Sequence, residues 1–311
     1  MELQPAEVFR VHRVPLLFES AAAHQWMVYD ARRVGQFRRA IQETVTQGDV
    51  VVDLGTGTGL LAFLCARAGA RRVHAIERNP VILGWAERLA RANGLAERVM
   101  FHHGDSREVE LGEPADLIIG ELIGAMAFEE GIVDAQLDAQ ERFLRPGGRV
   151  IPQAVTLVAA PVSAQWTYAA CVDGWVPAYG LDFSAMRGPA LRAFYQVWLS
   201  EADVLAEPWP ALAADFVRGI RPEPAAQGRF TVTRVGTVHG VGLWFEATLA
   251  DGVSLGSGPS SGTHWGQTFV PIPRPIPVCP GDRLWAGIDL RLSARGDEGC
   301  ELGVRVSREP G

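Results

Sequence analysis

The chain has 311 residues and 48% hydrophobic content, which suggests about two domains with packed cores. Its formal net charge of −7 and its dispersed arginines argue against a nucleic-acid-binding surface, and no apolar run is long enough to span a bilayer. The beginning of the chain shows no signal-peptide pattern, and the four scattered cysteines form no CxxC pair, which favours a reducing cytoplasm over a disulfide framework or a zinc site.

The first half of the chain alternates between helical and strand patterns. A polar, arginine-rich helix is predicted over 20–46. Strands are predicted at 49–54, 72–76, 99–102 and 116–119, and helices at 60–67, 80–93 and 129–144, the last closed by Pro-Gly-Gly at 146–148. This alternation predicts an α/β fold with a doubly wound, Rossmann-like sheet.

The pattern changes at Pro152, after which short strand-like runs follow one another. Strands are predicted at 154–162, 230–238, 242–250, 283–292 and 301–307, with a hairpin turn at Asp251-Gly252 and proline-dense loops at 208–224 and 271–280. An aromatic-rich segment at 164–190 is predicted as a helical excursion. We therefore predict a helical segment (1–46), a Rossmann-like domain (47–152) and a mostly β, barrel-like domain (153–311).

Residues 51–59 read Val-Val-Asp-Leu-Gly-Thr-Gly-Thr-Gly, a strand followed by a glycine turn and a helix start. Such a turn binds ligands well, because glycines let a ligand lie against the backbone and the helix N-terminus offers free N–H groups. A dinucleotide fingerprint needs glycine at position 60, which is Leu60, and a P-loop needs a lysine, whereas all 29 basic residues here are arginine. Asp53 disfavours a pyrophosphate but suits a cationic amino-acid group. The loop looks like the first motif of class I S-adenosylmethionine (SAM) methyltransferases, with a nicotinamide or flavin nucleotide, or a turn without ligand, as alternatives.

Polar side chains follow the next two predicted strands. Glu77 ends the second strand, where an acid would meet the hydroxyls of a ribose, or could be an exposed strand-end acid. Asp105 and Ser106 follow the third strand, where adenine-contacting groups lie in such sheets. Four further residues recur about every three positions on the first predicted helix, as on one amphipathic face: His24, Met27, Asp30 and Arg33.

Two carboxylates and one aromatic turn complete the candidate groups. Glu121 ends the fourth strand and Glu130 lies nine residues later, so both could face the crevice, although Glu129 and Glu130 could instead be first-turn acids of a helix. Thr263-His264-Trp265 lies in a polar, glycine-rich turn that core packing explains poorly, with a solvated loop as the alternative.

Taken together, these motifs resemble the protein arginine methyltransferase family over about residues 16–307. The family's helix motif, His-x-x-Met-Leu-x-Asp-x-x-Arg, reads here His24-Gln-Trp-Met27-Val-Tyr-Asp30-Ala-Arg-Arg33. Glu121 and Glu130 keep the family's nine-residue offset, and Thr263-His264-Trp265 matches its Thr-His-Trp loop. The all-arginine cation usage, with abundant alanine, suggests a GC-rich, bacterial source.

The resemblance implies roles for these residues. Glu121 and Glu130 would grip a guanidinium through its fork of N–H donors, Trp265 would wall the slot, and His264 would pair with Asp30. SAM would be the methyl donor and S-adenosyl-L-homocysteine the product. The implied cofactor-binding residues are His24, Met27, Arg33, Asp53, Gly55, Gly57, Thr58, Glu77, Asp105 and Ser106.

The resemblance also implies that residues 164–190 form a dimerisation arm, and hence a homodimer. From the scattered cysteines we separately expect a cytoplasmic location and no metal site. The chain departs from the family at Leu122-Ile123-Gly124-Ala125 and at Phe18-Glu-Ser-Ala-Ala22, where the family's tyrosines are missing. An arginine in a protein, a peptide, free arginine and a natural-product guanidine therefore stay open as acceptors. Two further alternatives are a small-molecule methyltransferase that acts on another nucleophile and a non-catalytic SAM-binding scaffold.

Overall fold

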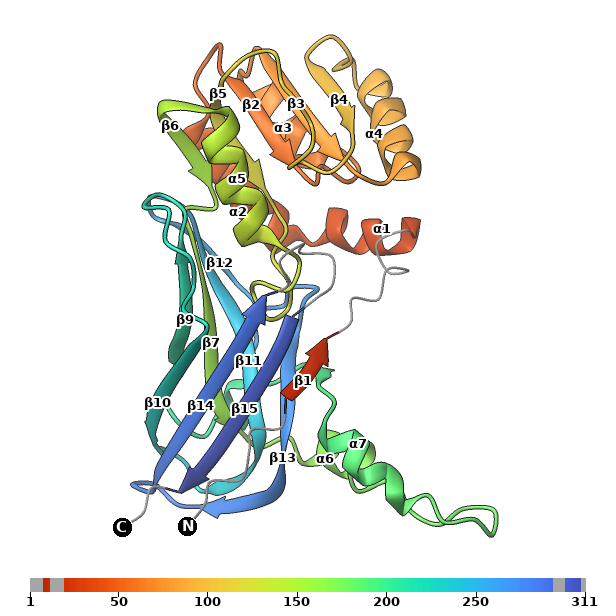
Figure 1. Cartoon of the computed structure of the whole chain (residues 1–311), viewed down its shortest axis with the longest axis vertical. Coiled ribbons are helices and arrows are strands. Elements are labelled where there is room, and N and C mark those ends of the chain that lie inside the picture. The colour runs from red at the N-terminus through yellow and green to blue at the C-terminus, as the bar shows by residue number, and fades with distance from the viewer. Residues whose placement is uncertain (1–7, 12–19, 293–299, 309–311) are drawn as a thin grey trace.

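The computed structural model describes residues 8–11, 20–292 and 300–308. A parallel α/β sheet forms one end of the molecule and antiparallel β structure forms the other, with the N-terminal helices between them (Figure 1). One continuous hydrophobic cluster joins the two, because Phe37 of the N-terminal helices, Val51 of the parallel sheet and Phe245 of the antiparallel part all belong to it.

The parallel sheet has five strands in the order β4-β3-β2-β5-β6. Val51 of the central strand packs in a cluster with helix α3, whereas Val52 packs in a cluster with helix α5, so helices cover both faces of the sheet. The predicted doubly wound fold is confirmed. The elements are β2 (Val50–Leu54), α3 (Leu60–Ala68), β3 (Arg72–Glu77), α4 (Pro80–Ala92), β4 (Val99–His103), β5 (Ala115–Gly120), α5 (Ile132–Phe143) and β6 (Leu144–Ile151).

The strand order places a switch point between β2 and β5. The chain runs outward from β2 through β3 to β4, then returns to the other side of β2 to form β5 and β6. The carboxyl ends of parallel strands at such a point form a crevice where ligands bind. Strand β6 was not predicted, because it begins with the turn-like sequence Leu-Arg-Pro-Gly-Gly.

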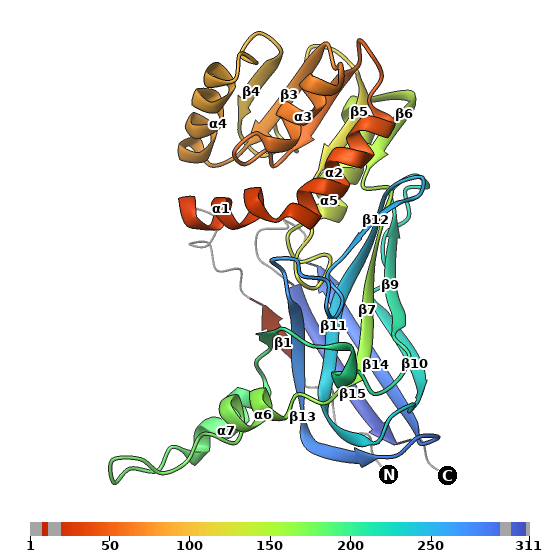
Figure 2. The ribbon, with the colours of Figure 1, turned by 180° about the vertical axis from the view of Figure 1, so that it is seen from behind.

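The N-terminal helical segment is broken at Asp30, so the prediction of one continuous helix is wrong. Helix α1 (Ala21–Tyr29) ends at Asp30 and helix α2 (Ala31–Thr44) begins there. Asp30 has an extended backbone (φ −68°, ψ 91°), and its side chain accepts a hydrogen bond from the Arg33 N–H at 2.9 Å. Asp is a strong helix N-cap, and this local bond outweighs continuation of the helix. Helix α1 consequently lies across the gap between the parallel sheet and the barrel (Figures 1 and 2).

The antiparallel part consists of two sheets, and the predicted barrel-like fold is confirmed. One sheet has the order β1-β15-β14-β10; the other has the order β8-β13-β11-β7-β9, with β12 also paired to β11. Phe230, Val238 and Leu284 belong to a cluster that both sheets share. The strands are β1 (Val8–Val11), β7 (Ala154–Val162), β8 (Tyr195–Val197), β9 (Trp209–Asp215), β10 (Ala225–Thr231), β11 (Gly236–Ala250), β12 (Val253–Gly256), β13 (Gln267–Val278), β14 (Arg283–Leu292) and β15 (Cys300–Arg308).

Two proline-dense segments that were predicted as loops contain strands β9 and β13. Strand β9 ends its sheet, and its Pro210 lies where the register with β7 shifts. Among the residues that the structure describes, strand β13 is paired with β8 only over Gln267–Phe269, so most of that edge has no described partner strand in the sheet. Edge strands and bulges tolerate proline, since the missing N–H is not needed there. The loop prediction is therefore wrong for Trp209–Asp215 and for 271–278, whereas residues 216–224 lie outside the named strands as predicted. Strand bounds also differ at β10 and β11.

A helical arm projects from the barrel between β7 and β8 (Figures 1 and 2), which agrees with the predicted excursion at 164–190. It contains α6 (Gln165–Cys171), a short 3₁₀ turn and α7 (Arg187–Leu191). Tyr168 anchors its base by donating a hydrogen bond to the Ile272 carbonyl at 3.0 Å.

No helix within the described ranges has the length and apolar character to cross a bilayer.

Candidate functional site

A cavity of about 550 Å³ opens at the carboxyl ends of β2, β3 and β5. Helix α1 and the turn at 263–265 of the barrel also contribute to its wall. Asp30 is the one predicted site residue outside the lining. The predicted residues that line the cavity are His24, Met27, Arg33, Asp53, Gly55, Gly57, Thr58, Glu77, Asp105, Ser106, Glu121, Glu130, His264 and Trp265.

The glycine loop is tightly wound at the floor of the cavity. Gly55, Gly57 and Gly59 have φ values of 63°, 55° and 87°, a region that side chains with a Cβ avoid. A Cβ at Gly55 would also approach Leu122 to 2.6 Å. The loop therefore needs glycine for its own conformation, and it presents bare backbone to the cavity.

Asp53 braces this loop from inside the fold. It is buried, and its Oδ2 accepts hydrogen bonds from Thr56 Oγ1 at 2.6 Å and from the Ala62 N–H at 3.1 Å. Burial raises the pKa of Asp53 to about 7, although the bonds from Thr56 and Ala62 oppose this rise. A cation in the cavity would favour the ionised form of this carboxyl.

Glu77 joins the end of β3 to the same loop. Its Oε2 accepts from the Gly57 N–H at 3.0 Å, and its Oε1 accepts from the Asn79 N–H at 2.9 Å. The carboxylate is thus fixed at the crevice by two backbone donors, and its remaining lone pairs face a cavity that it lines.

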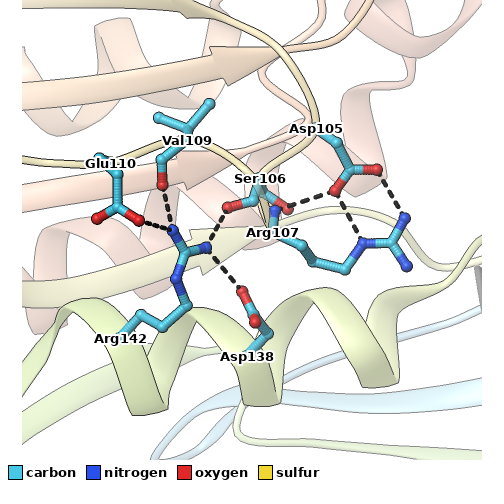
Figure 3. A network of polar contacts seen from close by, with 7 residues as sticks. All are labelled: Asp105, Ser106, Arg107, Val109, Glu110, Asp138 and Arg142. Carbon is cyan, nitrogen blue, oxygen red and sulfur yellow. Dashed lines mark hydrogen bonds and ion pairs between the residues drawn. The ribbon is translucent and has the colours of Figure 1, made fainter.

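The turn after β4 forms another part of the wall (Figure 3). Arg107 donates to both oxygens of Asp105, through Nε at 2.8 Å and Nη2 at 2.6 Å, and this contact lowers the pKa of Asp105. Arg142 of α5 donates to the Ser106 carbonyl at 2.9 Å and also to the Val109 carbonyl. Neither Arg107 nor Arg142 was predicted from the sequence.

Arg33 and Glu121 form a buried ion pair in the middle of the cavity wall. Arg33 places Nε 2.7 Å and Nη2 2.6 Å from Glu121 Oε2, and its Nη1 donates to the Met27 carbonyl at 3.0 Å. The other oxygen of Glu121 accepts from the Ile123 N–H at 3.1 Å. A guanidinium group therefore already lies on this carboxylate.

Glu129 and Glu130 precede helix α5, which begins at Ile132 after the N-cap Gly131, so the predicted helix start at 129 is wrong. Both oxygens of Glu129 accept from the Met126 N–H, at 2.9 and 3.1 Å, and burial raises the pKa of Glu129. Glu129 thus shapes the loop between β5 and α5, and both Glu129 and Glu130 line the cavity.

The turn at 263–265 connects the barrel to the N-terminal helices at Asp30 and to the loop after β5 at Ile123. Asp30 Oδ2 accepts from the His264 N–H at 2.9 Å and lies 2.8 Å from His264 Nδ1. Burial raises the pKa of Asp30, but the bonds from His264 and from the Arg33 N–H outweigh it and lower the pKa to about 2. Trp265 Nε1 donates to the Ile123 carbonyl at 2.8 Å, and its ring lies 4.1 Å from that of His264.

Several lining residues had no signal in the sequence. Phe194 and Gln196 come from the segment after the arm, and Gln196 Nε2 donates to the Trp265 carbonyl at 2.9 Å. No motif marks either of them. Thr56 lies between two glycines of the loop, so the glycine motif itself could have identified it.

The cavity is acidic and contains no evident metal centre. Its carboxylates outnumber its arginines, and two of those arginines, Arg33 and Arg107, are paired with lining carboxylates. Among the residues that the structure describes, no group of three or more histidine, cysteine or acidic side chains is placed to hold a metal ion. A Rossmann-like sheet with an acidic crevice beside a glycine loop defines the chain as a small-molecule-binding α/β protein with an appended barrel.

Comparisons with known proteins narrow this class. The family model of the arginine methyltransferase oligomerization subdomain matches residues 153–300, and that of the TRM5/TYW2 methyltransferase domain matches residues 25–141. The probable protein arginine N-methyltransferase 6.1 of Oryza sativa subsp. indica is 30% identical over 82% of this chain and 77% of the rice protein. The chain belongs to the protein arginine N-methyltransferase family.

Other relatives agree with this membership. The arginine N(omega)-methyltransferase of Streptomyces achromogenes subsp. streptozoticus is 29% identical over 87% of this chain and 78% of that protein. The probable protein arginine N-methyltransferase 6 of Arabidopsis thaliana is 32% identical over 76% of this chain, which spans only 55% of that protein.

Among solved structures, the Trypanosoma brucei PRMT1 enzyme–prozyme heterotetramer with AdoHcy has a TM-score of 0.85 at 20% identity, covering 94% of this chain and 95% of that chain. The Arabidopsis thaliana protein arginine methyltransferase 10 has a TM-score of 0.79 at 24% identity, again covering 94% and 95%. At these identities the likeness shows the shared fold.

Proposed function

We propose that this chain is a SAM-dependent N-methyltransferase that transfers a methyl group to a guanidino nitrogen of arginine and releases S-adenosyl-L-homocysteine (SAH). The observation that carries the proposal is the seating of the Arg33 guanidinium on Glu121, at 2.7 and 2.6 Å, within a cavity that the glycine loop also lines. The Glu121 carboxylate, which binds one guanidinium there, has the charge and the oxygens to bind another that enters from solvent.

The chemistry requires help from carboxylates. A guanidinium is a poor nucleophile, because it stays protonated below a pKa of about 12 and its lone pairs are delocalised. Glu121 and Glu130 would hold positive charge on two of its nitrogens and orient the third toward the methyl donor. Bound SAM supplies an electrophilic methyl group on a sulfonium. As the nitrogen bonds to the methyl carbon, the bond from that carbon to sulfur breaks and leaves its electron pair on sulfur. The nitrogen loses one proton, for which Glu130 or His264 is the proposed acceptor.

The fit of SAM rests on the glycine loop and its neighbours. Backbone without side chains at Gly55 and Gly57 leaves room for the ligand, and Asp53 would face its amino group. Glu77 would bind the ribose, Asp105 and Ser106 the adenine, and Arg33 the carboxylate of the ligand. The other proposed cofactor contacts are His24, Met27 and Thr58.

The proposed wall of the acceptor slot is the turn from the barrel. Trp265, held to the Ile123 carbonyl at 2.8 Å, would flank the acceptor guanidinium. His264 would keep α1 over the site through Asp30, because the two side chains lie 2.8 Å apart.

Glutamine substitutions test the carboxylate roles directly. Glu121→Gln and Glu130→Gln should each abolish methyl transfer, while SAH binding measured by calorimetry stays close to wild type. Glu43→Gln is a matched control, since Glu43 forms an exposed surface pair with Arg39. Full transfer activity in either site variant would contradict the assigned roles. A wild-type chain that binds SAH but methylates no guanidine would instead favour a non-catalytic scaffold.

The acceptor is best sought among small guanidines as well as proteins. The Streptomyces relative is named an arginine N(omega)-methyltransferase, which supports free arginine as a candidate beside arginine in a peptide. Mass spectrometry of the products from free arginine, an arginine-rich peptide and unrelated amines separates these candidates. Methylation of the amines alone would favour the alternative of a different nucleophile.

A homodimer is part of the proposal. The arm exposes large aromatic side chains, with Trp166 90% and Tyr179 99% exposed, and the oligomerization subdomain model covers this segment. Light scattering of the purified chain and of a Trp166→Ser, Tyr179→Ser variant would test it, and a monomeric wild type would contradict it.

The scattered cysteines and all-arginine cation usage support a cytoplasmic location and a bacterial source. The domain bounds at 46/47 and 152/153 stay predictions.

A further inference from the structure

Arg142 lies behind the wall of the cavity and connects helix α5 to the turn after β4 (Figure 3). Its Nη1 donates to the Ser106 carbonyl at 2.9 Å and to Asp138 Oδ2 at 3.1 Å. Its Nη2 donates to the Val109 carbonyl and lies 3.3 Å from Glu110 Oε1. One side chain thus bonds two carbonyls of the same turn.

Besides the bonds from Arg142, the turn from 104 to 110 is held by backbone hydrogen bonds and by Val109, which packs against a buried cluster of the parallel sheet and α5. Its internal bonds run from the Glu108 and Val109 N–H groups to the Asp105 carbonyl, at 2.9 and 3.1 Å. The Gly104 N–H donates to the Glu77 carbonyl at 3.1 Å, which fixes the start of the turn. Arg142 binds the turn in its middle at the Ser106 carbonyl and near its far end at the Val109 carbonyl, and Ser106 lines the cavity.

The guanidinium is suited to this task by its shape. A planar fork presents parallel donors that can reach two carbonyls of one turn at once, whereas a lysine ammonium concentrates its donors at one point. The group is further oriented by Asp138 one helical turn earlier on α5, and by the ring of Phe143, whose centroid lies 4.5 Å from the guanidinium carbon. Arg142 is therefore held in place on both sides of its contact with the turn.

We infer that Arg142 is a positioning residue for the adenosine end of the cofactor site. It acts through the Ser106 and Val109 carbonyls, which set where Asp105 and Ser106 present their polar groups to the cavity. The inference rests on the proposed function, because that assigns Asp105 and Ser106 to the cofactor. Loss of the fork should weaken cofactor binding without changing the transfer step.

The test compares Arg142→Gln and Arg142→Lys with a matched control, Arg145→Gln. Arg145 lies just after the end of the same helix, is half-exposed and pairs with Asp116 at 2.6 Å. SAH affinity is measured by calorimetry on the full chain, and kcat at saturating SAM with an arginine acceptor. We expect about tenfold weaker SAH binding for Arg142→Gln, a smaller loss for Arg142→Lys and no loss for Arg145→Gln. The kcat of all three should stay within about twofold of wild type, because the carboxylates that hold the guanidinium are untouched.

The outcomes separate the possible failures. The inference would be overturned if the folded Arg142 variants bound SAH as tightly as wild type. It would also be overturned if kcat fell while SAH affinity stayed the same. If Arg142→Gln does not fold, Arg142→Lys gives the deciding measurement. Failure of the wild-type chain to bind SAH would contradict the proposed function itself, which distinguishes that failure from failure of the positioning role.

Discussion

Arg33 and Glu121 are joined in a buried ion pair between α2 and the end of β5, although 88 residues separate them in the sequence. Both side chains are less than 10% exposed. Removing one partner of such a pair leaves the other charge buried and unpaired, which costs more than the pair itself contributes. The pair also places the proposed carboxylate contact of the cofactor next to the proposed contact of the acceptor.

Arg33→Lys should impair both the proposed cofactor site and the proposed acceptor site. A lysine ammonium does not reproduce two donors on Glu121 Oε2 together with one on the Met27 carbonyl. We expect SAH affinity to fall by about tenfold and kcat/KM for transfer to fall further. Arg32→Lys is the matched control, because Arg32 is exposed on the same helix. Equal behaviour of the two variants in calorimetry and initial-rate assays would contradict a role for the pair.

Substitutions of Asp30 should separate helix capping from the contact with His264. Asparagine caps helices about as well as aspartate, so Asp30→Asn keeps the bond from the Arg33 N–H but removes the charge beside His264. The amide NH2 of asparagine would then face the His264 N–H, which is also a donor, so Asp30→Asn should reduce turnover and lose the stability that the bonds from His264 contribute. Asp30→Ala should also lose about 1 kcal/mol of unfolding free energy. Chemical denaturation and activity assays on both variants measure the two effects, and unchanged turnover in Asp30→Asn would refute the positioning of His264.

Asp53 should release a proton when the cofactor site fills. Burial raises its pKa from 3.8 to about 7, so the folded chain binds more protons here than the unfolded chain. This group therefore lowers stability as the pH rises from 3.8 toward about 7. A bound amino group would favour the ionised form, so SAH should bind more tightly as the pH rises toward about 7. Calorimetry in buffers of different ionisation enthalpy should show proton release, which Asp53→Asn abolishes.

A pair of histidines on β3 and β4, His74 buried and His102 partly buried, should make stability fall in acid. His74 Nδ1 lies 2.9 Å from His102 Nε2, and the other His74 nitrogen lies 3.4 Å from Glu113, which is itself paired with Arg71 and Arg72. Burial lowers the pKa of both imidazoles from 6.5, so below that pH the unfolded chain binds more protons and the fold loses stability.

Thermal unfolding at about pH 7.5 and about pH 5.5 measures this loss. His102→Gln should show a smaller drop in Tm than wild type between the two pH values. His103→Gln is the control, because His103 is the exposed neighbour and contacts the Arg78 carbonyl. Asp53 contributes in the opposite direction, but it does so equally in all variants, so the comparison between them removes its effect. An equal drop in Tm for His102→Gln and His103→Gln would contradict the role given to the histidine pair.

Replacing Gly124 or Gly35 by alanine should change the free energy of unfolding in opposite directions. A Cβ at Gly124 would overlap the Glu129 carboxylate, which cannot move without breaking its bonds to the Met126 N–H. Gly124→Ala should cost about 1–3 kcal/mol of unfolding free energy and reduce activity. Gly35 lies in α2, and a Cβ added there would have no atom within 4 Å, so Gly35→Ala should stabilise by about 0.5–1 kcal/mol. Denaturant unfolding of both variants tests this contrast.

Sequence patterns were sufficient where a feature depends on neighbouring residues. The strand that ends at Asp53, the glycine turn and the helix from Leu60 are one local unit, and the structure has them at nearly the predicted bounds. Periodicity failed at Asp30, where a single side-chain cap interrupts an otherwise helical pattern. It failed again in β13, because sequence alone does not show that most of one edge of that strand has no described partner strand.

The parts of the site that could not be predicted depend on contacts between distant segments. Arg142 reaches Ser106 across 36 residues, and Gln196 reaches Trp265 across 69. Neither residue stands in a motif, and an arginine near the end of a helix is usually a solvated charge. Glu129 and Glu130 are adjacent in sequence and both line the cavity, and the Met126 N–H binds both oxygens of Glu129. Only the path of the loop, which the sequence does not show, decides which groups each of these two carboxylates meets.

The turn at 263–265 is the last part of the site to be synthesised. Asp30 is made 234 residues before the His264 that it binds, and Ile123 is made 142 residues before the Trp265 that donates to its carbonyl. Contacts between residues so far apart form only after the intervening chain exists and has closed its loop. A nascent chain thus has a complete glycine loop long before the acceptor side of the crevice has a wall. A message truncated before this turn would encode a protein that keeps the glycine loop but lacks the residues that enclose an acceptor.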